Sequence, residues 1–386
     1  MKEIKLTDSV RYIGVDDKTL DLFESQYRIP NGISYNSYVI LDEKIAVMDT
    51  VDKRGTAEWF ANLEKALEGR EPDYLVSLHL EPDHAGNIQS FAEKYPNAKI
   101  VASAKAVAML PQFFELDMSR VIAVKEGDTL DLGGRSLTFV MAPMVHWPEV
   151  MVAYDSEDKI LFSADGFGKF GALDAEEDWA CEARRYYFNI VGKYGAQVQA
   201  LLKKAAALDI RMICPLHGPV LSENLEYYMG KYQTWSSYAP EDKGVLVAYA
   251  SIHGNTAAAV RRFAEMLEEK GAKKVVLADL ARCDMAEAIE DAFRYDTLVV
   301  ASPTYDGNLF PVVEDFLYHL KIKTWRSRRA GIIENGSWAL SAGKLTRAYF
   351  EEMKNIEIVE PMVSIKSTMK PADEEKLAEL AEALVK

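Results

Sequence analysis

A regular alternation of apolar and amphipathic segments over residues 244–386 leaves few folds open to that part of the chain. Five strand-like runs, beginning with VLVAYAS (245–251), are each followed by a helix-like segment, and the final helix covers residues 373–386. Apolar strands that alternate with amphipathic helices form a parallel sheet with helices on both faces. We therefore expect a doubly wound α/β domain here.

The first 235 residues or so also mix strands and helices, but they include hairpins. SYVILD (37–42) and KIAVMD (44–49) predict a hairpin, and DYLVSLHL (73–80) predicts a buried strand. TAEWFANLEKALEG (56–69) predicts an amphipathic helix that ends before a glycine, and residues 181–208 predict a long helical stretch. This part is an α/β arrangement of a different kind.

The change of pattern falls at SSYAPEDKG (236–244), where a proline, a charge cluster and a glycine predict a linker. A chain of 386 residues suits two domains rather than one. We expect one domain over residues 1–239 and another over residues 244–386.

Charge and apolar content exclude several partners. The net charge of −15 argues against a nucleic-acid partner and against an anionic membrane surface, which would require a basic patch. No apolar run is long enough to span a membrane, and the opening MKEIKLTDSV lacks the apolar region of a secretory signal, so we expect a cytoplasmic protein. The three cysteines form no CxxC pair, which leaves no disulfide framework, zinc ribbon or fused rubredoxin.

Two histidines and two acidic residues crowd into six positions, 79–84, at the end of the buried strand 73–80. His79, Glu81, Asp83 and His84 form the pattern H-x-E-x-D-H. Pro82 interrupts the regular backbone, and an irregular turn allows several side chains to converge on one point, which a strand with alternating faces does not. The spacing predicts a cluster of metal ligands.

Three further polar residues follow apolar runs in the same half, each within two residues of a glycine or proline. They are His146 in PMVHWP, Asp165 in FSADGFG and His217 in PLHGP. The chain has six histidines, and four of them occupy these strand ends. A single histidine at such a position is usually a hydrogen-bonded structural residue. The whole set is better explained by metal binding, because an uncompensated group of buried carboxylates would be costly.

The ligand types restrict the choice of metal. Four imidazoles and three carboxylates are enough for two ions, with one carboxylate bridging them. Zinc sites favour histidine and cysteine in closed tetrahedra, whereas sites rich in carboxylate with open positions favour iron or manganese. Glu81 is informative because it supplies an anionic oxygen where a hydrolytic zinc site would carry a third imidazole.

A second constellation, SIHGNT, lies between a strand and a helix of the second half. Small and hydroxyl side chains with free backbone N–H groups at a helix start suit a phosphate. The alternative is an ordinary helix cap formed by Asn255 or Thr256. The candidate phosphate-binding residues are Ser251, His253, Gly254, Asn255 and Thr256.

Two later loops follow the third and fourth strands of that half, SPTYDGNLFP (302–311) and NGSWALSAG (335–343). Loops at the carboxyl ends of the strands of a doubly wound sheet line its ligand crevice. Tyr305 and Trp338 are aromatic and suited to cover a planar ring, with plain surface packing as the alternative. The candidate ligand-binding residues here are Ser302, Pro303, Thr304, Tyr305, Asp306, Gly307, Asn308, Trp338 and Gly343.

Both constellations together resemble one known family. H-x-E-x-D-H with the later histidine, aspartate and histidine resembles the metallo-β-lactamase-like domain of the flavodiiron proteins, whose hydrolytic relatives carry H-x-H-x-D-H. SIHGNT resembles the flavodoxin phosphate loop S/T-x-x-G-N-T. The resemblance covers the whole chain. It implies an N-terminal metallo-β-lactamase-like αββα sandwich followed by a flavodoxin-like doubly wound parallel sheet.

The resemblance also implies an activity and its cofactors. FMN would relay electrons to a pair of irons that reduces dioxygen to water, nitric oxide to nitrous oxide, or both. It implies His79, Glu81 and His146 on one iron. It implies Asp83, His84 and His217 on the other, with Asp165 as the bridge. No catalytic residue beyond these ligands is implied.

The resemblance further implies a head-to-tail homodimer, or a dimer of such dimers, in which each flavin faces the partner's irons. Because no CxxC module follows the second half, the electron donor is expected to be a separate molecule. Rubredoxin is the favoured candidate and a deazaflavin cofactor the alternative.

Two stretches depart from the family pattern. NGSWALSAG keeps the tryptophan and the final glycine of the second flavin loop, but shifts the motif between them. Gly168 and Lys169 stand where many relatives carry a Gln-His pair beside the metal pocket. The preference between oxygen and nitric oxide therefore does not transfer, and the roles of Trp147 and Lys169 stay open.

Two other readings compete with this hypothesis. The first is a zinc hydrolase joined to a flavodoxin-like module, which Glu81 disfavours. The second is a non-enzymatic redox carrier or sensor with a vestigial metal fold, which the complete set of seven ligands disfavours. Metal analysis distinguishes the zinc hydrolase from the flavodiiron reductase. Reaction of the reduced protein with dioxygen and with nitric oxide distinguishes the redox carrier or sensor from the reductase.

Overall fold

The computed structural model describes residues 4–386, so the first three residues of the predicted first domain lie outside the described part. The chain forms two compact units. Unit 1 comprises Met1–Tyr187 and Tyr194–Gln233, and unit 2 comprises Phe188–Lys193 and Thr234–Lys386. The division near Gln233 falls within helix α7 (Leu225–Ser236), whereas the predicted domain boundary lies a few residues further on.

Unit 1 contains two large sheets. The first has the order β1-β2-β7-β8-β9-β10-β11 and mixes antiparallel with parallel pairs. Its strands are β1 (Ile4–Lys5), β2 (Val10–Tyr12), β7 (Tyr38–Ile40), β8 (Ala46–Met48), β9 (Tyr74–Ser77), β10 (Lys99–Ser103) and β11 (Val121–Val124). The predicted hairpin of residues 37–49 is confirmed as β7 and β8, which pair antiparallel.

The second sheet has the order β12-β13-β14-β15-β16. Its strands are β12 (Thr129–Asp131), β13 (Ser136–Met141), β14 (Met151–Asp155), β15 (Ile160–Phe162) and β16 (Met212–Cys214). β14 is antiparallel to both β13 and β15, and β16 is parallel to β15. β13, β15 and β16 therefore run in the same direction, and their carboxyl ends meet at one edge.

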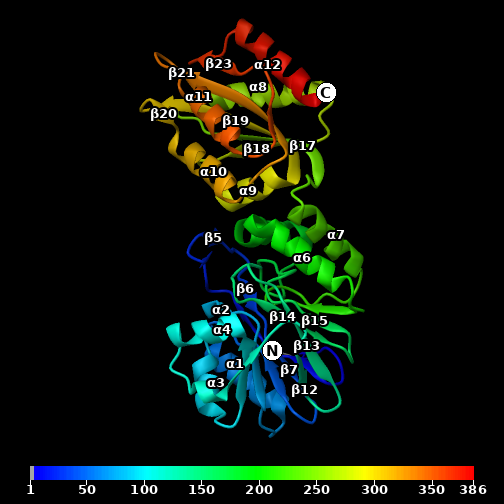
Figure 1. The fold of residues 1–386 in the computed structure, drawn as a ribbon. Coiled ribbons are helices and arrows are strands. Elements are labelled where there is room, and N and C mark those ends of the chain that lie inside the picture. The colour runs from blue at the N-terminus through cyan, green and yellow to red at the C-terminus, as the bar shows by residue number, and fades with distance from the viewer. Residues whose placement is uncertain (1–3) are drawn as a thin grey trace. The chain divides into compact units, whose positions relative to one another are not determined.

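Short strand pairs and helices complete unit 1. The small pairs are β3 (Val15–Asp17) with β6 (Ile33–Tyr35), and β4 (Leu22–Phe23) with β5 (Tyr27–Arg28). Helices and helical turns are Lys53–Gly55, α1 (Thr56–Leu67), α2 (Pro82–Ala85), α3 (Ile88–Lys94), α4 (Ala104–Met109), Leu110–Gln112 and Met118–Arg120. Figure 1 shows α1, α3 and α4 on one side of unit 1 and strands β12–β15 on the other, as expected for the predicted sandwich.

The helical stretch predicted over residues 181–208 is interrupted. α5 (Trp179–Tyr186) passes into a π-helical turn, Tyr187–Val191, and a short 3₁₀ turn, Gly192–Tyr194, before α6 (Gly195–Ala205). A single π-helical turn within a helix is a frequent feature of functional sites. Here it directly follows Tyr186, whose ring lies 5.5 Å from that of the candidate ligand His217.

Unit 2 has the strand order 2-1-3-4-5 of the flavodoxin-like topology, which confirms the predicted doubly wound sheet. The strands are β17 (Asp242–Tyr249), β18 (Val275–Asp279), β19 (Tyr295–Tyr305), β21 (Arg328–Gly336), β22 (Ile356–Ile358) and β23 (Val363–Lys366), with β20 (Asn308–Leu309) attached to β19. The predicted fifth strand is divided into β22 and β23, and both pair with β21 in parallel.

Helices cover both faces of this sheet. They are α8 (Asn255–Glu269), α9 (Met285–Arg294), α10 (Pro311–Ile322), α11 (Ala342–Glu352) and α12 (Pro371–Val385). α8 and α12 share one apolar core with the central strands, in which Phe263 and Leu380 are fully buried. Figure 1 shows α9 and α10 on the opposite side of the sheet from α8 and α12. This burial fixes the start of α8 beside the carboxyl ends of the strands.

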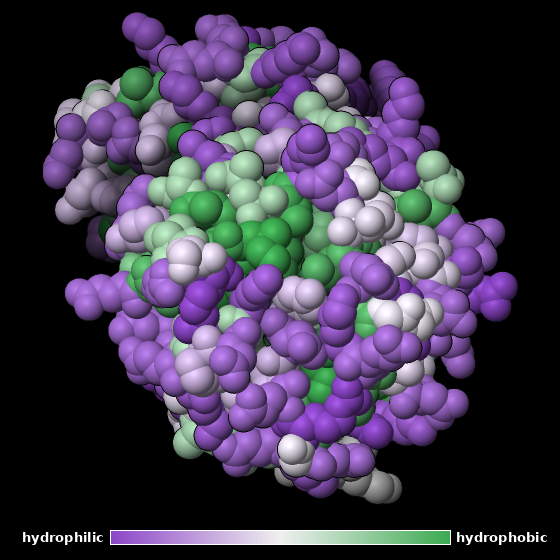
Figure 2. Space-filling view, turned by 60° about the horizontal axis from the view of Figure 1, so that its bottom comes forward, coloured by the Kyte–Doolittle hydropathy of each residue, from purple (hydrophilic) through white to green (hydrophobic). Residues whose placement is uncertain are grey.

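The outer surface agrees with the composition of the chain. In the face shown in Figure 2, hydrophilic residues surround a limited hydrophobic area. Within residues 4–386, no helix combines the length and the apolar character that a bilayer crossing requires.

Candidate functional site

The seven predicted metal ligands lie at strand ends and in one short helix of unit 1. His79 follows β9 of the first sheet, Glu81 precedes α2, and Asp83 with His84 lies inside α2. His146, Asp165 and His217 follow β13, β15 and β16 respectively. Because those three strands are parallel to one another, their ligands lie at one edge of the second sheet. The ligands of α2, which follows β9 of the first sheet, lie close to the same edge.

The structure brings the seven residues together as two groups of candidate ligands. Within each group, one donor atom from every residue lies within 4.8 Å of the others. The first group is His79, Glu81, His146 and Asp165, and the second is Asp83, His84 and His217.

The first group converges through one nitrogen or oxygen of each side chain. Oε2 of Glu81 lies 3.2 Å from Nε2 of His79 and 3.0 Å from Nε2 of His146. Oδ2 of Asp165 lies 3.1 Å from Nε2 of His146. Donor atoms bound to one cation at about 2.1 Å lie about 3.0–3.5 Å apart for octahedral or tetrahedral angles. The observed spacing therefore fits a single ion.

The second group has the same spacing. Oδ2 of Asp83 lies 3.2 Å from Nε2 of His84 and 3.3 Å from Nε2 of His217. The other carboxylate oxygen of Asp165, Oδ1, lies 3.2 Å from Nε2 of His84. Asp165 thus presents one oxygen to each group, which is the arrangement required of a bridging carboxylate.

Several of these buried atoms lack any hydrogen-bond partner in the described protein. They are both carboxylate oxygens of Asp83, both of Asp165, both ring nitrogens of His84, and Nε2 of His217. Buried polar atoms are nearly always hydrogen-bonded, so this concentration of exceptions needs a reason. Two cations, one in each group, would provide ligand bonds for the donor atoms that converge there. The residues therefore fit a two-metal site.

Imidazoles and carboxylates of the cluster shift each other's pKa values. Burial alone would lower the pKa of His79, but the carboxylates of Asp165 and Glu149 outweigh it and raise that pKa well above its ordinary value. Burial would raise the pKa of Asp165, yet His79 and His84 hold it well below its usual range. Divalent ions would replace these protons, because histidine and carboxylate bind metals in their deprotonated forms.

Two of the residues with positive φ flank the ligands in the chain. Met144 and Ala164 have φ angles of 65° and 49°, and each lies within two residues of a ligand. Asp49, with φ 53°, accepts hydrogen bonds from the backbone N–H groups of Leu78 and His79. Non-glycine residues rarely adopt positive φ, and such strain tends to occur where a site dictates the backbone path.

Aromatic rings pack around His217 of the second group. The rings of Phe23, Tyr35 and Tyr186 lie 5.4, 6.0 and 5.5 Å from that of His217. On the other side, the ring of Trp147 lies 5.3 Å from that of His79. This apolar layer excludes water, and burial raises the pKa of Tyr186 well above its ordinary value, so the residue stays a neutral phenol.

Lys169, a departure noted in the sequence, pairs with residues outside both ligand groups. Its Nζ atom donates to the carbonyl of Phe170 and lies 3.0 Å from Oε2 of Glu177. Although only 4% of its surface is exposed, it is held by these partners and is not part of either ligand group.

Glu149 is a buried residue that the sequence analysis missed. Its Oε1 atom lies 2.8 Å from Nδ1 of His79 and accepts the backbone N–H of Leu80. In HWPEV a glutamate next to a proline has the appearance of a surface residue, and no local pattern distinguishes it.

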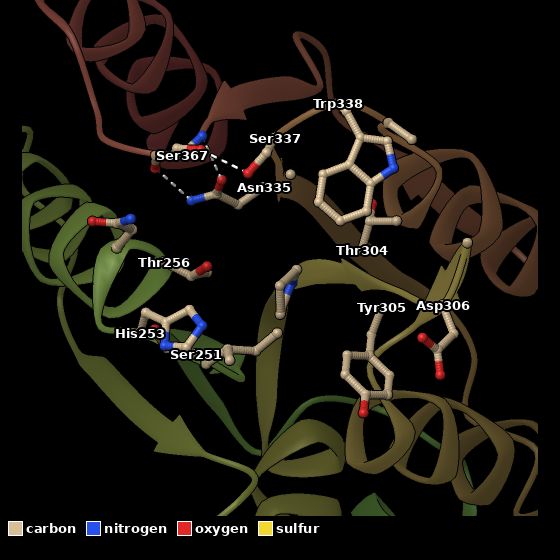
Figure 3. Close-up of a pocket in the computed structure, with 16 residues that line it drawn as sticks. Ser251, His253, Thr256, Thr304, Tyr305, Asp306, Asn335, Ser337, Trp338 and Ser367 are labelled. Carbon is tan, nitrogen blue, oxygen red and sulfur yellow. Dashed lines mark hydrogen bonds between the residues drawn. The ribbon is translucent and has the colours of Figure 1, made fainter.

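A second candidate site is a cavity of about 380 Å³ in unit 2, at the carboxyl ends of the strands. Figure 3 shows His253 and Thr256 on one side of it and Tyr305 and Trp338 on the other. Its volume lies in the range usual for cofactor sites. Predicted residues that line it are Ser251, His253, Asn255, Thr256, Pro303, Thr304, Tyr305, Asp306, Gly307 and Trp338.

Four predicted residues lie outside the lining of this cavity. Gly254, with φ 89°, caps α8, and its N–H donates to Oγ of Ser251, so it shapes the loop. Ser302 is buried, Asn308 lies in β20, and the N–H of Gly343 donates to Oε2 of Glu334.

The cavity is also lined by Asn335 and Ser337, which lie in the predicted loop 335–343 but were not candidate residues, and by Ser367, which lies outside both predicted loops. The hydroxyl oxygens of Ser337 and Ser367 lie 2.9 Å apart, and Nδ2 of Asn335 donates to the carbonyl of Ser367 (Figure 3). Ser367 follows β23, about 30 residues from the other two, so only the parallel pairing of β21 with β23 reveals it.

Exposed aromatic side chains border the same cavity. Trp338 is 96% exposed and Tyr305 is 44% exposed. Aromatic rings at the border of a cavity combine a large apolar face with access to a bound ligand. Both residues suit contact with a flat aromatic ligand.

Comparisons with known proteins agree with this architecture. Residues 33–218 match the family model described as the ODP family beta lactamase, which covers the stretch from β6 to beyond the last candidate ligand. An uncharacterized protein of Methanocaldococcus jannaschii is 30% identical, over 82% of this chain and 81% of the relative. The anaerobic nitric oxide reductase flavorubredoxin of Aliivibrio fischeri is also 30% identical, over 90% of this chain and 73% of the relative.

Solved structures resemble the chain over its whole length. Rubredoxin oxygen:oxidoreductase from Desulfovibrio gigas superposes with a TM-score of 0.92, at 27% identity, and covers 100% of this chain and 98% of its own. The flavodiiron protein from Giardia intestinalis superposes with a TM-score of 0.89, at 25% identity, and covers 100% of this chain and 95% of its own.

Proposed function

The chain belongs to the flavodiiron protein family, and from that premise we propose that it is an oxidoreductase in which FMN relays electrons to a di-iron centre. The reaction is the reduction of dioxygen to water, of nitric oxide to nitrous oxide, or of both. The observation that carries this proposal is the pair of ligand groups in unit 1, which share the two carboxylate oxygens of Asp165.

We assign His79, Glu81 and His146 to one metal position. Asp83, His84 and His217 form the other, and Asp165 bridges the two. The three carboxylates contribute three negative charges against the four positive charges of two divalent ions. When bound, an iron pair supplies reversible changes of valence and open coordination positions for a small gas.

The side chains around these ligands have two roles in the proposal. Nδ1 of His217 donates to the carbonyl of Ser34 at 2.7 Å, which leaves Nε2 free for a metal. The aromatic layer formed by Phe23, Tyr35 and Tyr186 keeps bulk water from that half of the site. A dry, rigid site limits side reactions of a reduced gas.

We propose that FMN occupies the cavity of unit 2, with its phosphate against the start of α8. Backbone N–H groups and the helix dipole favour an anion there, and Ser251, His253 and Thr256 add polar contacts. The exposed rings of Tyr305 and Trp338 would cover the isoalloxazine.

A head-to-tail homodimer, or a dimer of such dimers, is proposed for electron transfer between flavin and iron. The two cofactor sites belong to different units of the chain, and the exposed aromatic border of the flavin cavity is suited to burial against a second copy. We propose a separate rubredoxin-like protein as the electron donor, with a deazaflavin as the alternative, and the name of the Desulfovibrio gigas relative supports the first choice. A cytoplasmic location stays a prediction.

Stopped-flow oxidation of the chemically reduced protein, run in parallel with dioxygen and with nitric oxide, tests the function. We expect rapid reoxidation of the flavin by at least one gas, and the faster reaction identifies the substrate. A reduced, iron-loaded protein that reacts with neither gas would favour a redox carrier instead. Two zinc ions and no iron in anaerobically purified protein would favour the hydrolase reading.

A further inference from the structure

Glu149 lies directly behind His79, on the side away from the ligand group. Both residues are 1% exposed, and Oε1 of the carboxylate lies 2.8 Å from Nδ1 of the imidazole. The backbone N–H of Leu80 donates to the same oxygen at 3.0 Å. A carboxylate accepts hydrogen bonds and does not donate them when ionised, so Nδ1 carries the proton and Nε2 faces the metal position.

The position of this carboxylate is fixed by contacts between the two sheets of unit 1. Glu149 lies two residues before the start of β14, and its carbonyl accepts a hydrogen bond from Oγ of Ser103 at the end of β10. The N–H of Met151 donates to the carbonyl of Leu78, which joins β14 to the segment that carries His79. Glu149 is thus held where it cannot reach bulk water.

In the second ligand group, neither His84 nor His217 has a carboxylate hydrogen-bonded to Nδ1 among the described residues. Nδ1 of His217 faces the neutral carbonyl of Ser34, and Nδ1 of His84 has no hydrogen-bond partner in the described protein. A carboxylate partner makes an imidazole a stronger electron donor than a carbonyl partner does. The two metal positions therefore differ in the basicity of their ligands.

We propose that Glu149 is a positioning residue that makes the two metal positions unequal, an inference that rests on the proposed function. It holds His79 in one tautomer and one orientation and raises its electron donation. The metal position formed by His79, Glu81 and His146 consequently binds a divalent ion more tightly than the position formed by Asp83, His84 and His217. For the same reason its iron is the harder of the two to reduce.

The test uses full-length protein freed of metal and titrated with Co²⁺ in two backgrounds. His217→Ala disables the second position, and His146→Ala disables the first. In the His217→Ala background, Glu149→Gln should weaken Co²⁺ binding about 10–100-fold. In the His146→Ala background, the same change should leave the affinity nearly unaltered, because Glu149 then contacts no ligand of the remaining position.

Two further variants separate positioning from folding. Glu149→Asp keeps the charge but withdraws it from His79, and it should give an intermediate loss in the His217→Ala background. Glu157→Gln alters an exposed glutamate in the turn after β14, and it should change neither background. If Glu149→Gln prevents folding, the Co²⁺ affinity of Glu149→Asp decides the question. An equal loss of affinity in both backgrounds, or no loss in either, would overturn the proposal.

A redox titration of the iron-loaded Glu149→Gln protein gives an independent readout. With the added donation removed, the two reduction steps should move closer together, and the EPR signal of the half-reduced pair should weaken. An unchanged separation would contradict the proposal. Neither measurement depends on turnover, so a protein that shows this inequality but reduces neither gas would refute the proposed function alone.

Discussion

Nε2 of His146 lies 3.1 Å from Oδ2 of Asp165, while Oδ1 of the same carboxylate is turned to the other ligand group. The aspartate follows β15 and the histidine follows β13, and these parallel strands of the second sheet direct both side chains to one edge. Asp165 is fully buried. One side chain therefore joins two sets of ligands that come from both sheets of unit 1.

Replacing Asp165 by alanine should remove the shared ligand of both metal positions. We expect Asp165→Ala to retain less than one iron per chain while its flavin absorbance is unchanged, because the flavin cavity belongs to unit 2. Iron analysis and a visible spectrum of anaerobically purified protein check this. Asp209→Ala, a change at an exposed aspartate, is the matched control. Full iron content in Asp165→Ala would mean that the bridge is misassigned.

Removing Trp338 should weaken flavin binding without weakening the fold. Contacts between aromatic rings contribute about 0.5–1.5 kcal/mol, so Trp338→Ala should lower the FMN affinity roughly 2–10-fold. The side chain is 96% exposed, and the melting temperature of the metal- and flavin-free protein should stay the same. Fluorescence titration with FMN measures the affinity. Tyr318→Ala, on α10 outside the cavity, should leave it unaltered, and an equal loss in both variants would contradict the proposed ring contact.

Truncating the core beneath α8 should destabilise unit 2. Phe263 is fully buried in the core shared by α8 and α12. Phe263→Ala should cost about 3–5 kcal/mol of the free energy of unfolding, as large-to-small changes in a packed core do. Urea unfolding followed by circular dichroism provides the measurement. Ile322→Ala removes a 40%-exposed side chain at the end of α10 and should cost far less; similar costs would show that α8 is loosely packed.

The metal-free protein should lose stability as the pH rises. Burial lowers the pKa of His146, but Asp165 and Glu81 outweigh it and raise the pKa to about 9 from the ordinary 6.5. A raised pKa means that the folded chain holds the proton more tightly, so this stabilisation is complete below pH 6.5 and is lost as the pH rises through about 9. The shift corresponds to stabilisation on the order of 3 kcal/mol.

Chemical unfolding of the metal-free protein across this pH range measures the effect. His146→Gln should lose less stability than the parent protein between pH 6.5 and pH 9. His319→Gln, on α10 of unit 2, should behave like the parent. A parent protein that is equally stable at both ends of the range would contradict the prediction.

Sequence periodicity predicted those parts of the fold in which each element is long enough to show a pattern. The five strand and helix pairs of unit 2 are such elements, and H-x-E-x-D-H indicated where β9 ends. The two-residue strands β4 and β5 are too short to show a period and were missed. The π-helical turn Tyr187–Val191 was also missed, because its residues are compatible with an ordinary helix.

Site residues that depend on contacts between distant segments could not be predicted from the sequence. The ligands could be found because histidine is rare in this chain and each ligand follows an apolar run. Glu149 could not be found in this way, because its partner His79 is 70 residues away and the burial of Glu149 depends on both sheets. Ser367 enters the flavin cavity only because β23 pairs with β21.

Iron content combined with Mössbauer spectroscopy of anaerobically prepared protein tests the central claim, that two ligand groups joined by Asp165 hold a pair of redox-active ions. We expect two irons per chain, with the spectrum of an exchange-coupled pair in the oxidised protein. Zinc in their place, a single iron, or two irons without magnetic coupling would contradict the account.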